Sequence, residues 1–310
     1  MSIIVPPLKC QGIKTKLVPW VKELAGKNFD RWIEPFLGSG VVAFNSEAKK
    51  AYLADINPHI IAFYKAMQEN KINPATVREY LEKEGEILSK ADDKGYVHYR
   101  FVRDRFNKEK APLDFLFLSR AGFNGMMRFS KAGNWNIPFC KKPNRFSQSY
   151  VTKISNQVKY CSEAIQKDWE FKTQDFRETI SKAKEGDLIY CDPPYAGRYV
   201  DYFSGWTDKD EHDLFELLLK SNAKFILSSW HHNDYRKNEM IDLYWNKFNI
   251  VTRDHFYHSG AKEENRKSIV EALVFNFDSD LQKHNHGLKT ITNTQIELFD
   301  KQDLPYAAAI

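Results

Sequence analysis

The sequence has few cysteines and no long apolar run, and these absences exclude several classes of protein. Its four cysteines are scattered over 310 residues without a CxxC pair, so neither a zinc site nor a disulfide framework is predicted. No apolar segment approaches the roughly 18–20 residues of a membrane-spanning helix. The first residues, MSIIVPPLKCQG, lack the apolar core of a secretory signal. We therefore expect a reduced, cytoplasmic protein with no metal and no membrane partner.

Positive charge is present but unevenly distributed. The chain carries a net charge of +5, and 42% of its residues are hydrophobic, which is ordinary for a protein with a sizeable core. Residues 112–153 contain seven lysines and arginines but a single acid, Asp114, and aromatic side chains are interleaved with the basic ones. Such a mixture suits a phosphate backbone and stacked bases. A solvated basic surface over an aromatic core explains the same composition equally well.

Strand-like and helix-like segments alternate along most of the chain. A strand-like run at 32–36 ends in the glycine turn GSG at 38–40. A helix start follows at 41–48, then a second buried strand at 51–55 and a helix from Pro58. This order is half of a doubly wound nucleotide-binding sheet, so the predicted fold class is α/β. Further strand-like runs lie at 169–173, 187–191, 224–230, 248–254 and 268–277.

The middle of the chain departs from this alternation. Residues 72–107 are charged and helical in pattern, and two short strand-like runs flank the residues KAG at 131–133, which predicts a β-hairpin. We therefore predict a discontinuous sheet domain at 1–64 and 151–280, interrupted at 65–150 by a mainly helical insertion. Residues 281–310 are polar and aperiodic, which predicts a flexible tail.

The glycine turn and Asp55 predict a cofactor site at the edge of the sheet. The glycines of EPFLGSG (34–40) lack a Cβ, so the backbone there can approach a ligand closely. Asp55 closes the next strand, where a carboxylate can accept hydrogen bonds from a ribose diol. The pattern favours an adenosine-type cofactor without saying which one. A tight turn followed by a helix-capping acid is the alternative.

The motif DPPY at 192–195 follows the strand at 187–191 and so belongs at the carboxyl edge of the sheet. Its two prolines fix φ and stiffen the loop. Asp192 and the Pro193 carbonyl then form two fixed acceptors, which match the two hydrogens of an exocyclic amino group. Tyr195 offers a ring on which a heterocycle can stack, and we assign all three residues as catalytic. Alternatively, Asp192 caps the next helix and the prolines merely end the strand.

Four blocks of sequence, in fixed order, resemble the Dam-type DNA adenine-N6 methyltransferases (D12 class, alpha group). They are LKCQGIKTKL, EPFLGSGVVAFN, LSRAGFNGMMRFSKAGNWNIPF and YCDPPY, and the resemblance covers about residues 5–277. The runs CKKPNRF and WHHNDY look most like the EcoRV-type modification enzymes within that family. The resemblance implies a Rossmann-like sheet that binds S-adenosylmethionine, with the insertion as a DNA target-recognition domain. One departure is Cys10, where the family usually carries Trp.

The same resemblance implies which residues surround the cofactor and the DNA. Lys9 and Arg128 match positions that contact guanines, and Phe123 matches a ring that wedges into the duplex. The other implied DNA-binding residues are Arg120, Asn124, Asn136, Pro138, Lys141 and Lys142. The implied cofactor set is Cys10, Gly12, Lys14, Glu34, Phe36, Gly38, Gly40, Asp55 and Asp192, with Asp175 and Phe176 near the adenine.

The implied reaction is methyl transfer to the N6 of an adenine flipped out of double-stranded DNA. Hydrogen bonds from N6 to Asp192 and to the Pro193 carbonyl would make that nitrogen more nucleophilic, so no covalent enzyme intermediate is needed. The EcoRV-type resemblance favours GATATC as the site, with GATC second, and a cognate restriction endonuclease as a partner. The alternatives are an N4-cytosine or RNA adenine methyltransferase, a catalytically silent DNA-binding protein, and a nicotinamide-dependent oxidoreductase.

The segment TQIELFD at 294–300 lies in the predicted tail. It resembles the short peptides with which bacterial replication and repair proteins dock on the sliding clamp. Gln295 would make polar contacts with the clamp, and Leu298 with Phe299 would anchor in an apolar pocket. A tail that packs back on the domain is the alternative, because short motifs recur freely.

Overall fold

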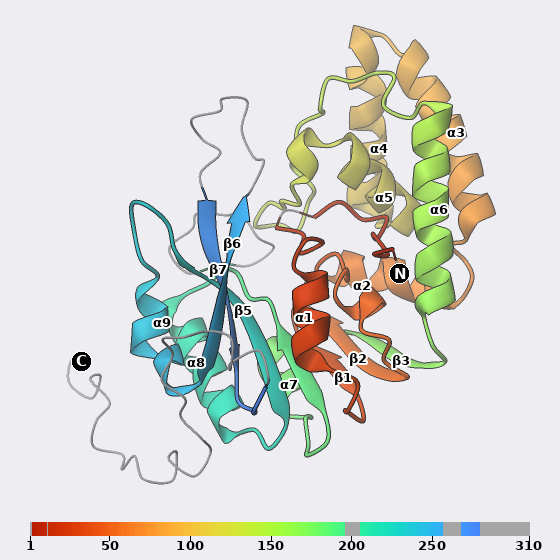
Figure 1. The fold of residues 1–310 in the computed structure, drawn as a ribbon. Coiled ribbons are helices and arrows are strands. Elements are labelled where there is room, and N and C mark those ends of the chain that lie inside the picture. Colours follow the sequence, from red (N-terminus) through yellow and green to blue (C-terminus); the bar gives the residue numbers. More distant parts are fainter. Residues whose placement is uncertain (1, 11, 196–204, 257–267, 280–310) are drawn as a thin grey trace.

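The computed structural model describes residues 2–10, 12–195, 205–256 and 268–279, and its centre is a seven-stranded sheet (Figure 1). The strand order is β3-β2-β1-β4-β5-β7-β6. The strands β1 to β5 run parallel, and β7 lies antiparallel between β5 and β6. The strands are β1 Trp32–Glu34, β2 Lys50–Asp55, β3 Asp168–Thr173, β4 Leu188–Cys191, β5 Lys224–His232, β6 Asn249–Phe256 and β7 Ser268–Phe275. Each overlaps a strand predicted from the sequence, so the α/β fold class is confirmed.

The central strands are buried on both faces, which is why they read as apolar runs. Every residue of β1 and β4 is buried, as expected for parallel strands covered by helices on both sides. Helices α1 (Val18–Ala25) and α2 (Pro58–Gln68) pack on one face. Helices α7 (Phe176–Ile180), α8 (Asp208–Lys220) and α9 (Glu239–Leu243) pack on the other. The functional residues are thereby left to the open carboxyl edge of the sheet.

The prediction of a helix at 41–48 is wrong. Only one 3₁₀ turn, η1 (Ala43–Asn45), forms there. The Asn45 amide donates to the carbonyls of Val41 and Ile4 at 2.7 and 2.9 Å, and its Oδ1 accepts from the Ile4 N–H at 2.9 Å. The Ser46 hydroxyl donates a hydrogen bond to the Ala43 carbonyl at 2.7 Å. These side chains occupy carbonyls that a continuing helix would use, and they tie the N-terminal segment to the turn.

Between α2 and β3 the chain forms helices α3 (Pro74–Lys90), α4 (Tyr96–Glu109), α5 (Pro112–Ala121) and α6 (Gln148–Ala164), with the turns η2 (Asp93–Gly95) and η3 (Phe123–Gly125). They stand together beside α2, away from β5, β6 and β7 (Figure 1). Their apolar side chains join the same buried cluster as α1 and α2. The predicted boundaries at 64/65 and 150/151 fall inside α2 and α6, and the division into domains stays a prediction.

The predicted hairpin takes a minimal form. Phe129 and Trp135 make an isolated antiparallel bridge, and the turn between them is closed by hydrogen bonds from Ser130 N to Asn134 O and from Gly133 N to Ser130 O, both 2.8 Å. A second bridge joins Gly122 to Phe139. These bridges hold the loops after α5 close together without regular strands.

The tail at 281–310, and with it Gln295, Leu298 and Phe299, lies outside the described residues. The clamp-docking motif therefore stays a prediction. Across the parts of the chain that are described, none of the helices combines the length and the apolar character that a bilayer crossing requires.

Candidate active site

A cavity of about 390 Å³ opens at the carboxyl ends of β1, β2 and β4. Its size lies within the range of small-molecule and cofactor sites. The glycine turn contributes one wall and the DPPY corner another, so the two sequence motifs share one space. Of the residues predicted to bind the cofactor or to catalyse the reaction, those that line the cavity are Cys10, Gly12, Lys14, Glu34, Phe36, Gly38, Asp55, Asp175, Phe176, Asp192, Pro193 and Tyr195.

Asp55 organises the glycine wall. Its Oδ2 accepts a hydrogen bond from the Gly38 N–H and its Oδ1 one from the Asn57 N–H, each at 2.8 Å. Burial raises the pKa of the Asp55 carboxyl to about 6. Each carboxylate oxygen keeps a second lone pair, so the group can also accept from two ligand hydroxyls. Asp55 can thus fix the glycine turn and accept hydrogen bonds from a ligand at the same time.

Gly40 does not line the cavity, in contrast to the other residues predicted to bind the cofactor. Its φ of +72° lies in the left-handed region. A Cβ at this position would come within 2.7 Å of the Phe44 ring. The glycine therefore serves the turn and the packing beneath it, rather than a ligand.

Asp192 is the acid of the opposite wall. It is 23% exposed, and the Lys14 ammonium lies 3.2 Å from its Oδ1. Burial raises the pKa of the Asp192 carboxyl to about 6, against the opposing effect of Lys14. The same ammonium lies 4.4 Å from the centre of the Tyr195 ring, a cation–π contact. The Tyr195 hydroxyl donates to Glu271 Oε2 at 2.8 Å.

Burial favours the neutral forms of Glu34 and of two nearby cysteines. Glu34 accepts from the Trp32 indole at 2.9 Å. Burial, with the Asp192 charge adding to it, raises the Glu34 pKa well above its usual range. Burial also raises the pKa of Cys10 to about 12, and the Cys10 thiol donates to Met127 Sδ at 3.8 Å. Cys191 is fully buried in β4 with a raised pKa, so neither thiol is an activated nucleophile.

An aromatic wall closes the cavity on the α7 and α8 side. The rings of Phe36 and Phe176 stack at 5.3 Å, and Trp206 meets them at 5.6 and 5.4 Å. Sequence reasoning missed Trp206, although its place directly before the helix-capping Thr207 was a usable signal. Flat apolar surfaces of this kind suit a planar heterocycle.

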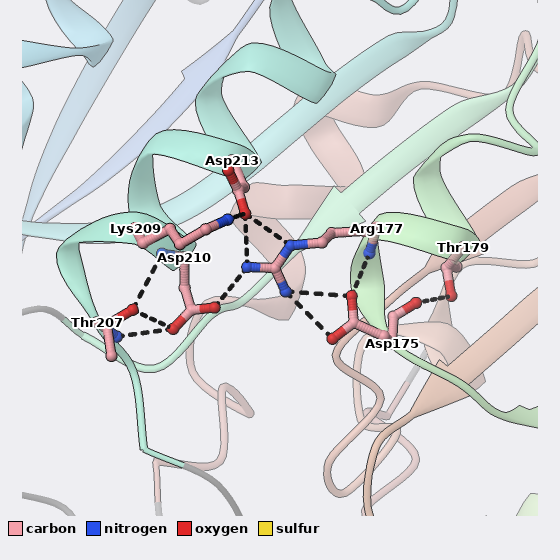
Figure 2. A network of polar contacts seen from close by, with 7 residues as sticks. All are labelled: Asp175, Arg177, Thr179, Thr207, Lys209, Asp210 and Asp213. Atoms are coloured by element: carbon pink, nitrogen blue, oxygen red, sulfur yellow. Dashed lines mark hydrogen bonds and ion pairs between the residues drawn. The ribbon is translucent and has the colours of Figure 1, made fainter.

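A polar network holds this wall in place (Figure 2). Asp175 caps α7 by accepting from the Arg177 N–H at 2.8 Å. The Arg177 guanidinium pairs with Asp175 at 3.2 Å, with Asp210 at 2.6 Å and with Asp213 at 2.8 Å. Thr207 and Asp210 form the capping box that starts α8. Arg177 therefore locks α7 to α8, and both Asp175 and Asp210 line the cavity.

The chemistry of the lining fits S-adenosylmethionine. Among the described residues that line the cavity, Lys14 is the single base and faces several acids, so the space favours a cationic ligand. Gln174 Nε2 and the Tyr190 hydroxyl are buried in this lining without a hydrogen-bond partner in the described part of the chain. Such groups are costly unless a ligand or water satisfies them. With Asp55 for a diol and an aromatic wall for a base, the lining matches a charged nucleoside.

Most of the predicted DNA-binding residues lie at the surface of the loops after α5. Phe123 is 49% exposed, a large fraction for an aromatic side chain, and its N–H donates to the Pro138 carbonyl at 2.9 Å. Arg128 donates to Asn136 Oδ1 at 2.9 Å, which orients its guanidinium. Lys9 is half-buried, and its stem packs against Gly125. The remaining exposed members are Asn124, Asn136, Pro138, Lys141 and Lys142.

Arg120 differs from the other members of that set because it is buried. Only 6% of it is exposed, and its guanidinium donates to the Pro7 carbonyl and to Gln157 Oε1, both at 2.6 Å. A further bond to the Tyr150 hydroxyl spans 3.3 Å. Its donors are engaged inside the protein, where they tie the N-terminal segment to α6. Arg120 thus has a structural role in the described protein, and these contacts do not support its predicted place in the DNA-binding set.

The mostly parallel sheet and the cavity at its carboxyl edge define a Rossmann-like α/β protein with a ligand site where such sheets bind nucleotide-type cofactors. The sequence model for the D12 class of N6 adenine-specific DNA methyltransferases matches residues 11–259. The chain belongs to this family. It is accordingly an adenine-specific DNA methyltransferase whose methyl donor is S-adenosylmethionine.

Three curated relatives illustrate the membership. The chain is 28% identical to type II methyltransferase M.MjaIII of Methanocaldococcus jannaschii, over 88% of this chain and 99% of that one. It is 28% identical to type II methyltransferase M.FokI of Planomicrobium okeanokoites over 89% of its length, and spans 43% of that longer protein. It is 30% identical to the DNA adenine methylase of Escherichia coli K12, over 61% of this chain and 64% of that one.

Proposed function

We propose that the protein methylates the N6 of an adenine that has swung out of a short palindromic DNA site into the described cavity. The observation that carries the proposal is the shared space between the glycine wall and the DPPY corner. An adenine stacked in a duplex cannot reach such a space. Extruding the base costs a few kcal/mol. The exposed Phe123 is the residue we assign to fill the gap in the duplex, and Tyr195 the ring that receives the base.

The Asp192 carboxylate and the Pro193 carbonyl act on the amino group of the target base. They sit on a backbone stiffened by two prolines, and Asp192 is further fixed by Lys14. Two fixed acceptors bind the two N6 hydrogens and favour a tetrahedral nitrogen with a localised lone pair. Because they are oriented before the base arrives, little reorganisation is needed during the reaction.

The remaining cavity residues hold the donor. S-adenosylmethionine supplies a methyl group on a sulfonium centre, which is reactive enough to need no covalent enzyme intermediate. Asp55 is placed to accept from the ribose hydroxyls, and the Phe36, Phe176 and Trp206 rings to enclose the adenine. Holding both reactants in one orientation supplies much of the rate.

For the site, we propose GATATC, with GATC as the second choice, read by the loops after α5. The test uses duplexes that carry GATATC, GATC or a scrambled site, with labelled donor. The product nucleoside is then identified by chromatography. We expect N6-methyladenine on GATATC above all others. Equal labelling of all three duplexes would contradict the assignment, and N4-methylcytosine as product would contradict the reaction.

Arg128→Ala is expected to relax discrimination at one base pair by about 1–3 kcal/mol, the worth of a bidentate guanine contact. The measurement is kcat/KM on duplexes with single base changes across the site. Lys141→Ala is the matched control, because an exposed lysine on phosphate should weaken all duplexes alike. A uniform loss for Arg128→Ala as well would show that Arg128 contacts phosphate.

The pH dependence of the reaction should report Asp192. Its carboxyl must be ionised to accept from N6, and its pKa is raised to about 6. At saturating donor, kcat/KM for DNA should therefore be constant at neutral pH and fall about tenfold per pH unit below that value. Saturating donor removes the contribution of Asp55, which titrates in the same range. If kcat/KM instead began to fall only near pH 4, the ordinary pKa of an aspartate, the proposed role of Asp192 would be contradicted.

Two further partners are proposed from the sequence alone. A cognate restriction endonuclease would accompany a site-specific methyltransferase of this kind. The bacterial sliding clamp would bind the motif at Gln295, Leu298 and Phe299, which lies outside the described residues.

A further inference from the structure

Glu271 is a fully buried acid in the middle of β7. Its exposed fraction is 0%, and full burial of a glutamate is rare unless the group is paired. In the sheet, its neighbour on β5 is Trp230 and its neighbour on β6 is Arg253, whose side chain is exposed. Ordinary core packing at this position would call for an apolar residue. We therefore expect the carboxylate to be hydrogen-bonded to a buried polar group.

One such group is the Tyr195 hydroxyl, which donates to Glu271 Oε2 at 2.8 Å. A hydrogen bond to a carboxylate is stronger than one between neutral groups. It holds the hydroxyl end of the ring while the two prolines hold its backbone end. The orientation of the ring in the cavity is thus set from both ends.

Glu271 also belongs to the set of charges around Asp192. The titratable groups that face Asp192 come from several elements: Lys14 from the N-terminal segment, Glu34 from β1, Tyr190 from β4, and Tyr195 and Glu271. Lys14 lowers the pKa of Asp192 and Glu271 raises it. The ammonium of Lys14 contacts both Asp192 and the Tyr195 ring, so the four side chains form one continuous unit.

We propose that Glu271 is a positioning residue for the target base, which orients Tyr195 through its hydroxyl and acts by its charge on the protonation of Asp192. The proposal rests on the function proposed above. It assigns two separable effects to one carboxylate. The hydrogen bond to Tyr195 increases kcat, and the negative charge sets the pH at which kcat/KM falls. A purely structural glutamate would produce neither.

Three variants separate the effects. Glu271→Gln keeps an oxygen that accepts from Tyr195 but removes the charge. The value of kcat at neutral pH should therefore stay unchanged, whereas the acid limb, which is the fall of kcat/KM at acidic pH, should move to lower pH. Glu271→Ala should move the limb in the same way and also lower kcat about tenfold, the loss expected for one charge-assisted hydrogen bond. Tyr195→Phe should lower kcat to the same extent with the charge of Glu271 still in place. The double variant Glu271→Ala/Tyr195→Phe should be no slower than either single one, because both act through one bond.

Glu84→Gln is the matched control. Glu84 is a buried acid of α3, bonded to His98 at 2.7 Å and to Arg105 at 3.0 Å, and it does not line the cavity. Substitution of Glu84 should leave the pH at which kcat/KM falls unchanged from that of the native protein. An unmoved limb in Glu271→Gln, or rate losses that multiply in the double variant, would overturn the proposal. Full activity of Asp192→Ala would instead overturn the proposed function, so the two failures are distinguishable.

Discussion

Replacing Asp192 by alanine is expected to lower the rate of methyl transfer by about 10²–10³-fold, the range seen when one preoriented polar group is removed from a reacting centre. The variant keeps the Pro193 carbonyl but loses the charged acceptor for N6. The affinity for S-adenosylmethionine should remain within about threefold of native, because a group that acts mainly in the transition state contributes little to ground-state binding. Single-turnover rates at saturating donor, with calorimetric titration of the donor, measure the two quantities.

The control for Asp192→Ala is Asp213→Ala. Asp213 is another acid of the same region, bonded to Arg177 and Lys209, but it does not line the cavity. Its removal should leave the single-turnover rate near native, since Arg177 retains Asp175 and Asp210 as partners. If Asp192→Ala loses donor affinity as strongly as it loses rate, Asp192 belongs to the cofactor pocket and not to the reaction.

Replacing Asp55 by alanine is expected to raise the dissociation constant for S-adenosylmethionine by about 10²-fold. The change removes the acceptor for two backbone N–H groups and, in the proposed assignment, for the ribose hydroxyls of the donor. Hydrogen bonds to a charged group contribute about 1.5–3 kcal/mol each, and about 1.4 kcal/mol corresponds to a tenfold change in affinity. Calorimetric titration of the donor measures the change directly.

The contrast with Asp192→Ala provides the control for this second variant. At saturating donor, the single-turnover rate of Asp55→Ala should recover to near the native value, because Asp55 does not touch the target base. A native dissociation constant in Asp55→Ala would show that the diol binds elsewhere. A rate that stays low at saturating donor would show that the glycine wall also shapes the reacting geometry.

The sheet and the two motif corners could be predicted from the sequence because their signals are local. The apolar runs that became β1, β2 and β4 are buried on both faces, and each carries its functional acid at its end or just beyond it. Parallel strands bring such ends to one edge, so Asp55 and Asp192 were expected to be neighbours. Their common cavity follows from that topology.

What the sequence could not predict depends on contacts between distant segments. Arg120 lies in a basic, aromatic-rich stretch, yet its partners Pro7 and Gln157 lie far away along the chain and draw it into the interior. Glu271 meets Tyr195 across 76 positions of sequence, with no local pattern to mark it. The missing helix at 41–48 has both a local and a distant cause, because Asn45 bonds to the Val41 carbonyl and also to Ile4. In all three cases the hydrogen bonds include one to a residue far away along the chain.

The most direct test of the shared cavity is a map of modified bases. The native protein and the Asp192→Ala variant are each expressed in a host without adenine methylation, and the host DNA is read by single-molecule sequencing. We expect N6-methyladenine at one short palindrome in the first case and a strongly reduced fraction of marked sites in the second. Modified cytosine in the first map, or the same adenine marks in both maps, would contradict methyl transfer from a donor held by the glycine wall to an adenine held at the DPPY corner.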